Sequence, residues 1–165
     1  MNVDYLDASA WVKRYYAEAG TRWVQELFRR QQDLACSSLG AVEVIATLAR
    51  KRKAGAISQP EYDEKAQELA DDWSKFIQIE LTNEVAERAR EVAGRLAIRG
   101  ADAVHLASAL VLQSRLADED DRLTLVTSDR ELLEAAHRSG LTVVDPQAQD
   151  LASPNRINRH TAPES

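Results

Sequence analysis

The chain lacks several features that mark particular classes of protein. A single cysteine, Cys36, excludes an internal disulfide and is typical of a reducing compartment. No run of about eighteen apolar residues is present, so we expect no membrane span. The first residues show no basic segment followed by an apolar stretch, so no secretory signal is visible. These absences predict a cytoplasmic protein.

The chain also has fewer basic than acidic residues, 21 Lys and Arg against 27 Asp and Glu. The formal net charge of −6 argues against a general nucleic-acid coat, because such binding depends on Lys and Arg that neutralise phosphates. A nuclease is not excluded, because carboxylates that hold a divalent metal are locally acidic and the metal reverses that field. Internal repeats and glycine-rich phosphate loops are absent from the sequence. The 165 residues, 44% hydrophobic and 29% charged, are typical of one ordinary globular domain.

Short apolar segments alternate with amphipathic helical patterns along the chain. This alternation is typical of an α/β fold, in which helices cover both faces of a parallel sheet. We predict one domain over residues 1–146, followed by a polar C-terminal tail at 147–165 that is flexible. The strands are expected, with helices between them, at residues 3–6, 33–38, 76–81, 123–127 and 141–144.

Two aspartates stand where a predicted strand ends and a helix begins. Asp7 follows the first strand, and Asp129 follows the fourth. Ligands of open parallel sheets bind at this edge of the strands, although an aspartate there can also cap the next helix. Capping explains Asp129 less well, because Ser128 and Glu131 already form a predicted capping box.

Two further acidic residues lie on predicted helices. Glu43 lies inside the apolar run 41–46, and no basic residue stands three or four positions away. Its neighbours are therefore not the polar residues expected on a solvated helix face. A partly buried carboxylate needs a partner such as a metal ion. Asp102 opens an unusually apolar helix after Gly100, where helix capping is the alternative explanation.

The four carboxylates together predict more than each does alone. Carboxylates that pack together repel one another unless a cation neutralises them. Mg²⁺ and Mn²⁺ are hard cations that prefer carboxylate oxygens and water. If the four groups converge in the fold, the sequence predicts a divalent-metal site.

At these residues the sequence resembles PIN-domain ribonucleases, specifically the VapC-type toxins of toxin–antitoxin (VapBC) pairs. The resemblance implies a PIN-like three-layer sandwich, with a central parallel five-stranded sheet flanked by helices. The matching stretches follow the family's order over almost the whole chain, and they are Tyr5-Leu6-Asp7-Ala8-Ser9-Ala10 with Val12-Lys13-Arg14-Tyr15, Ser37-Ser38-Leu39 with Val42-Glu43, Arg99-Gly100-Ala101-Asp102-Ala103-Val104-His105-Leu106-Ala107-Ser108-Ala109, and Val126-Thr127-Ser128-Asp129.

The resemblance also implies an activity, a cofactor and partners. The activity is metal-dependent hydrolysis of RNA phosphodiester bonds, with Mg²⁺ or Mn²⁺ as the cofactor. Asp7 and Asp102 would be the primary metal ligands, and Ser9 or Thr127 would place a hydroxyl nearby. The partners would be an antitoxin whose C-terminal segment covers the acidic site, and a second copy in a homodimer. The catalytic set would be Asp7, Glu43, Asp102 and Asp129.

Basic residues must then meet the RNA. Lys13 and Arg14 follow the Asp7 turn and Arg130 follows Asp129, so these three are the expected phosphate contacts. The basic run at residues 50–53 is better explained as a solvated helix end, where cations are favourable.

Two other functions remain open at this point. A phosphatase-like hydrolase with an aspartyl nucleophile also places an aspartate after its first strand. That family carries an Asp-x-Asp pattern, whereas Asp4 and Asp7 here are three positions apart. A PIN-like module that binds RNA or protein without cutting is the second alternative, although such a scaffold has no need for four carboxylates.

Overall fold

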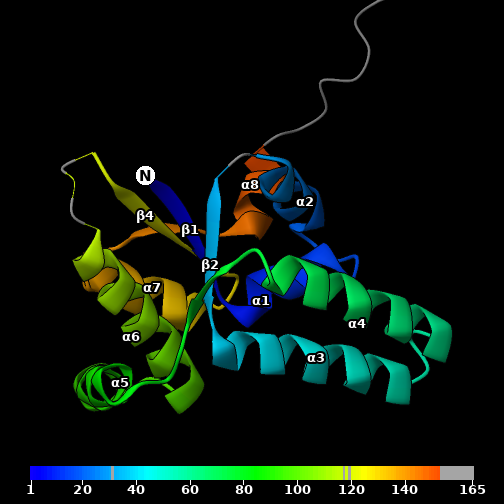
Figure 1. The fold of residues 1–165 in the computed structure, drawn as a ribbon, viewed down its shortest axis with the longest axis horizontal. Helices are drawn as coiled ribbons and strands as arrows, with labels where there is room; N and C mark the ends of the chain where they lie inside the picture. Colours follow the sequence, from blue (N-terminus) through cyan, green and yellow to red (C-terminus); the bar gives the residue numbers. More distant parts are fainter. Residues whose placement is uncertain (31, 117, 119, 153–165) are drawn as a thin grey trace, which may run out of the picture.

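Five parallel strands form one sheet in the order β3-β2-β1-β4-β5, and helices lie around it (Figure 1). The computed structural model describes residues 1–30, 32–116, 118 and 120–152. The sheet and its cover of helices confirm the predicted α/β sandwich. The strands are β1 (Asn2–Leu6), β2 (Asp33–Ser37), β3 (Ile77–Ile79), β4 (Arg122–Val126) and β5 (Thr142–Val144).

Helical segments lie between successive strands, because parallel neighbours need long crossover connections. Each helix in the described ranges is too short or too polar to cross a lipid bilayer. The helical segments are α1 (Ala8–Trp11), the 3₁₀ turn η1 (Val12–Arg14), α2 (Thr21–Arg29), α3 (Ser38–Lys53), α4 (Gln59–Trp73), α5 (Asn83–Leu96), α6 (Gly100–Arg115), α7 (Arg130–Arg138) and α8 (Pro146–Ala152).

The central strand β1 serves two hydrophobic cores, because successive side chains of a strand point to opposite faces. Val3 and Tyr5 pack with α5, α6 and α7 on one face of the sheet. Leu6 packs with α1, α3 and α4 on the other face. Burial on both faces explains why three of the four residues from Val3 to Leu6 are apolar.

Helices α3 and α4 form an antiparallel pair that extends away from the sheet (Figure 1). The turn between them ends in the capping box that starts α4. Ser58 Oγ accepts a hydrogen bond from the Glu61 N–H at 3.3 Å, and Glu61 Oε2 accepts one from the Ser58 N–H at 2.6 Å. The pair carries the basic end of α3 far from the strands.

The chain after residue 146 differs from the predicted loose tail. Residues Pro146–Ala152 form α8, which packs beside α2 (Figure 1). The Asp150 carboxylate accepts hydrogen bonds from the N–H groups of Gly20 and Trp23, both at 3.0 Å. These two donors lie at the start of α2, so the prediction of a flexible tail is wrong for residues 147–152.

A local signal for α8 was present in the sequence. Asp145 Oδ1 accepts a hydrogen bond from the Gln147 N–H at 2.9 Å, and Pro146 stands at the first helical position, where proline is common. The rest of the predicted tail, residues 153–165, lies outside the described residues.

Candidate active site

The order in which the strands are added to the sheet reverses between β1 and β4. From β1 the chain builds outward through β2 to β3, and it then returns to place β4 and β5 on the other side of β1. Ligands of such sheets bind at this switch point, outside the carboxyl ends of the strands. The turn after β1 lies beside the end of β4, because the Asp7 N–H donates to the Val126 carbonyl at 3.1 Å.

A pocket of about 480 Å³ opens at this edge of the sheet. Four segments that are far apart in sequence form its wall: residues 7–18 after β1, residues 42–50 of α3, residues 99–105 at the start of α6, and residues 128–129 after β4. The structure therefore brings the four predicted carboxylates to one place. The charged and polar residues of the wall include Asp7, Ser9, Lys13, Glu18, Glu43, Arg50, Arg99, Asp102, His105 and Asp129.

Asp7 is the most enclosed of the four carboxylates, with 3% of its surface exposed. Its Oδ1 accepts hydrogen bonds from the Ala10 N–H at 3.0 Å and from Ser9 Oγ at 2.8 Å, and Thr127 Oγ1 donates to its Oδ2 at 2.8 Å. Burial raises the pKa of Asp7, although the nearby His105 and these three donors act in the opposite direction. Asp7 therefore caps α1 and lines the pocket at the same time.

The hydroxyls of Ser9 and Thr127 tie the two strand-end turns together. Ser9 Oγ accepts a hydrogen bond from the Ser128 N–H at 3.0 Å, and Thr127 Oγ1 accepts one from the Asp129 N–H at 3.0 Å. Both hydroxyls donate to Asp7. Ser9 lies in the pocket wall, whereas Thr127 is fully buried behind it.

Arg99 bridges two of the carboxylates. Its Nε donates to Asp102 Oδ2 at 3.0 Å, and its Nη2 donates to Asp129 Oδ2. Burial raises the pKa of Asp102 and the charge of Asp129 adds to this, while Arg99 acts in the opposite direction. No role for Arg99 was predicted, although its place three residues before Asp102 on a helix is a typical ion-pair spacing.

The two aspartates of this bridge differ in their relation to the helices. Asp129 caps α7, because its Oδ1 accepts a hydrogen bond from the Leu132 N–H at 2.9 Å. The predicted capping box of Ser128 is wrong, since the Ser128 hydroxyl donates to Asp145 at 3.1 Å instead. Asp102 lies in the first turn of α6, where no side chain caps the helix. Capping therefore does not explain Asp102.

A chain of buried hydrogen bonds ends at Glu43. His105 Nε2 lies 2.6 Å from Glu43 Oε2, and His105 Nδ1 lies 2.9 Å from the Tyr5 hydroxyl. The Tyr5 oxygen accepts the Ser37 N–H at 3.1 Å, so with a neutral imidazole the Tyr5 hydroxyl donates to Nδ1 and Nε2–H donates to Glu43. His105 is 2% exposed, so it packs in the core and also reaches the pocket.

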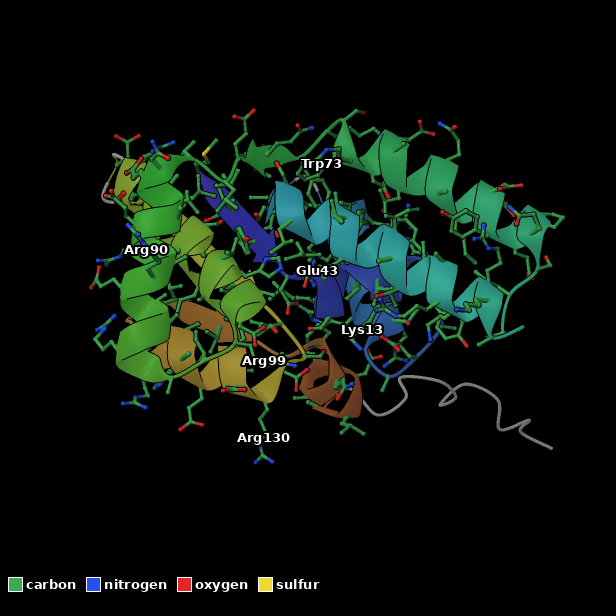
Figure 2. The ribbon with its side chains drawn as sticks, turned by 90° about the horizontal axis from the view of Figure 1, so that it is seen from below. Lys13, Glu43, Trp73, Arg90, Arg99 and Arg130 are labelled. Atoms are coloured by element: carbon green, nitrogen blue, oxygen red, sulfur yellow. The ribbon has the colours of Figure 1, made fainter. Side chains whose placement is uncertain are left out.

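Only one of the three predicted phosphate contacts lies at the pocket. Lys13 is in the pocket wall, where its Nζ donates to Glu18 Oε1 at 3.0 Å. Arg14 turns away from the pocket, because its Nε pairs with Asp72 Oδ2 at 3.3 Å. Arg130 is exposed and projects outward from α7 (Figure 2). Arg14 and Arg130 therefore point away from the pocket, although they follow Asp7 and Asp129 in the sequence.

Comparison with known proteins agrees with this geometry. The family described as PIN domain matches residues 5–138 of the chain. The chain belongs to the PIN-domain family. It is 34% identical over 147 residues to Ribonuclease VapC49 of Mycobacterium tuberculosis (strain ATCC 25618 / H37Rv), an alignment that covers 89% of this chain and 98% of that relative. The predicted VapC type of PIN domain is therefore confirmed.

Solved PIN-fold structures share the architecture at lower sequence identity. PAE2754 from Pyrobaculum aerophilum superposes with a TM-score of 0.64 at 22% identity, over 92% of this chain and 97% of its own. VapBC2 from Rickettsia felis, bound to a DNA fragment from its promoter, gives a TM-score of 0.57 at 16% identity, over 87% of this chain and 98% of its own. At these identities the likeness concerns the fold alone.

The carboxylates in the pocket of this PIN domain are the type of ligand that a hard divalent cation prefers. Four carboxylate groups line one pocket, and carboxylate oxygens are what Mg²⁺ and Mn²⁺ prefer. Among the residues that the structure describes, no three His, Cys, Asp or Glu side chains are grouped so that they could hold a metal ion. Arg99 occupies oxygens of two carboxylates, and its side chain is 67% exposed. In this structure the Arg99 guanidinium is therefore the cation that Asp102 and Asp129 share.

Proposed function

We propose that this protein is a metal-dependent endoribonuclease and the toxin of a toxin–antitoxin pair. One observation carries the proposal: Asp7, Glu43, Asp102 and Asp129, from four separate segments, line a single pocket. Helix capping does not account for this, because only Asp7 and Asp129 cap helices. The relative that is 34% identical to this chain is named a ribonuclease.

Each residue of the pocket has a part in the proposed hydrolysis of RNA. Asp7 and Asp102 would hold Mg²⁺, or Mn²⁺ in its place, and Glu43 and Asp129 would complete the acidic site. The ion, when bound, lowers the pKa of water and offsets negative charge on the reacting phosphate. Ser9 and Thr127 keep the Asp7 oxygens in a fixed orientation, because both hydroxyls donate to that carboxylate.

The electrostatics of the pocket support the need for a cation. Burial raises the pKa of both Asp7 and Asp102, so the charged form of each is disfavoured in the pocket. A positive ion at these oxygens would restore the charged forms. Lys13, which is 2% exposed at the pocket wall, supplies further positive charge for an incoming phosphate.

Two protein partners belong to the proposal. The VapBC2 structure of Rickettsia felis supports an antitoxin as one of them. A basic side chain of the antitoxin would neutralise the acidic pocket by pairing with Asp102 and Asp129, as the protein's own Arg99 does. A homodimer through surface helices and a cytoplasmic location are the remaining predictions.

A non-cleaving PIN-like module is the second candidate. The observation in its favour is the internal pairing of three carboxylates, with Arg99 on Asp102 and Asp129 and His105 on Glu43. The phosphatase alternative finds less support, since the described lining of the pocket includes Asp7 but not Asp4.

The test is cleavage of RNA by the purified protein. Total bacterial RNA is incubated with the protein in Mg²⁺ or in EDTA, and the new RNA ends are sequenced. The proposal predicts cuts at defined positions that appear in Mg²⁺ and disappear in EDTA. RNA that is bound but left intact in Mg²⁺ and in Mn²⁺ would favour the non-cleaving module.

A further inference from the structure

The last turn of α3 carries four consecutive cations, Arg50, Lys51, Arg52 and Lys53. Such a run is unusual in a chain with a formal net charge of −6. From the sequence alone, the run is expected to be a solvated helix end. In the structure, two of these side chains make contacts within the fold and two are exposed. The exposed pair suggests a binding role for this end of the helix.

Two of the four cations hold the fold together. The Lys51 ammonium lies 3.6 Å from the ring centroid of Tyr16, and the Arg52 guanidinium lies 4.3 Å from that of Tyr62. Arg52 also donates to the Gln59 side chain at 3.2 Å. These contacts attach α3 to Tyr16, which follows η1, and to α4.

The other two cations face solvent. Arg50 and Lys53 are both exposed. Arg50 Nη2 donates to the Thr47 hydroxyl at 2.9 Å, and this hydroxyl donates in turn to the Glu43 carbonyl at 2.9 Å. The recorded partner of Arg50 is therefore a neutral group, which leaves its positive charge available to a ligand.

Arg50 joins two hollows of the surface. It lies in the wall of the carboxylate pocket, and it also lines a neighbouring hollow of about 570 Å³. The described lining of that hollow is neutral or basic, and it consists of Ala49, Arg50, Arg52, Lys53 and Gln59. A path of positive charge therefore leads out of the acidic pocket.

The path follows one helix. Glu43 and Arg50 are seven positions apart, two turns of α3, so they lie on the same face. From Glu43 to Lys53 the helix rises about 15 Å. Figure 2 shows Glu43 near the middle of the molecule, with α3 running from there toward its outer end.

We propose that Arg50 and Lys53 bind backbone phosphates of single-stranded RNA beside the bond that is cut, so that the strand runs from the carboxylate pocket along the outer end of α3. This inference rests on the proposed ribonuclease function and adds the direction of the substrate. The contacts are to phosphates, so they bind RNA of any sequence.

Charge selects RNA over the other ligand that this surface could take, an acidic peptide. The path starts at four carboxylates, which would repel an acidic peptide. A phosphodiester strand meets the same carboxylates only at the bond to be hydrolysed, where a bound divalent ion reverses the local charge.

The experiment measures RNA binding in the Asp7→Asn background, which keeps the strand intact. Fluorescence anisotropy is recorded with labelled random-sequence single-stranded RNA of about 4 and about 16 nucleotides, in Mg²⁺ and over a range of salt. Arg50→Gln/Lys53→Gln should weaken binding of the longer RNA about tenfold. The salt slope of log K should fall by about 0.7 for each phosphate contact that is lost. Binding of the shorter RNA should change less than about threefold, because it need not leave the pocket.

A matched variant removes the same charge elsewhere. Arg90→Gln/Arg95→Gln takes two exposed arginines from α5, which lies at the opposite end of the molecule from the outer end of α3 (Figure 2). It should leave the affinity for both RNAs within about twofold. Equal losses from the α3 and α5 variants would overturn the proposed path. Binding of polyglutamate, with RNA affinity unaffected by the α3 variant, would overturn it in favour of an acidic partner.

The result also separates this inference from the function on which it rests. If the wild type cuts RNA and the α3 variant matches the α5 variant, the path along α3 is wrong and the ribonuclease stands. If no RNA is bound in the Asp7→Asn background and the wild type leaves RNA intact, both proposals are wrong.

Discussion

His105 Nε2 lies 2.6 Å from Glu43 Oε2, and this contact joins a core helix to the wall of the pocket. Behind it, the Tyr5 hydroxyl lies 2.9 Å from His105 Nδ1 and fixes which ring nitrogen carries the proton. The Glu43 side chain is 32% exposed, so the histidine holds a carboxylate that solvent and ligands still reach. We infer that His105 is a positioning residue that acts through Glu43.

Replacement of His105 should therefore affect turnover through Glu43. His105→Leu removes the donor, and we expect kcat for RNA cleavage to fall about tenfold, the equivalent of ~1.4 kcal/mol, with KM little changed. His105→Gln keeps an N–H donor and should retain more of the activity. Steady-state kinetics on a defined RNA measures both parameters.

The control for this prediction is a double-mutant cycle. In a Glu43→Gln background, His105→Leu should cost little further activity, because the group through which it acts is already altered. Additive losses would show that His105 acts independently of Glu43, for example through stability, which thermal unfolding of each variant would reveal.

Arg99 would compete with a metal ion for Asp102 and Asp129, because it pairs with both carboxylates. Arg99→Gln removes this internal cation, and we expect the affinity for Mn²⁺ to rise about three- to tenfold in the absence of RNA. Calorimetric titration of Mn²⁺ into the wild type and the variant measures it. The matched variant is Arg95→Gln, an exposed arginine of α5, which should leave metal affinity unchanged. Weaker metal binding by Arg99→Gln would contradict the competition.

Much of this site could be predicted from the sequence, because its strongest signals are local. Asp7 and Asp129 each follow an apolar strand, and the ends of parallel strands meet at one edge. Glu43 was recognised by its apolar neighbours along α3. The PIN resemblance at these same residues then correctly implied the sheet and its helices.

The parts that escaped prediction depend on side-chain direction and on contacts that are distant in sequence. Arg99 reaches across to Asp129, thirty positions away, and Arg14 turns from the pocket to Asp72. The docking of α8 depends on Asp150, which caps a helix that begins 129 residues earlier at Thr21. The pattern of hydrophobic and polar residues along a short segment cannot predict contacts between residues so far apart in the sequence.

At Gly40, close packing leaves no room for a larger side chain. A Cβ at Gly40 would lie 2.2 Å from the Cys36 sulfur and 3.2 Å from His105 Cε1. Gly40→Ala should destabilise the fold by about 1–3 kcal/mol, since it overpacks a buried contact. Thermal or urea unfolding measures the change.

The matched substitution is Gly94→Ala on helix α5, where a Cβ meets nothing within 4 Å. It should stabilise the protein by about 0.5–1 kcal/mol, because alanine is the better helix former. Cys36→Ala combined with Gly40→Ala should recover part of the loss by removing the sulfur. A Gly40→Ala variant as stable as Gly94→Ala would show that the contact relaxes without cost.

Asp4 should make stability depend on pH. It lies on the central strand β1, and burial raises its pKa, although Arg30 acts in the opposite direction. An acid whose pKa is raised by folding destabilises the fold once it ionises, so stability falls as the pH rises through the pKa of the folded state. Asp4→Asn should therefore raise the melting temperature at pH 7, by about 2–4 °C for each kcal/mol that is regained.

The comparison between two pH values isolates this effect. The advantage of Asp4→Asn over the wild type should shrink as the pH is lowered from about 7 to about 4, near the ordinary pKa of aspartate. Asp33→Asn, at an exposed position of β2, is the control and should show a smaller change. An advantage that is independent of pH would assign the effect to packing instead.

The central claim is that Asp7 belongs to a catalytic carboxylate cluster, and its most direct test is the rate of RNA cleavage in Mg²⁺ by Asp7→Asn. Asparagine caps helices as well as aspartate does, so the variant should keep the melting temperature within a few degrees. We predict that cleavage falls at least about a hundredfold, because a metal-activated reaction depends on its charged ligands. Cleavage at the wild-type rate by the folded variant would contradict the account.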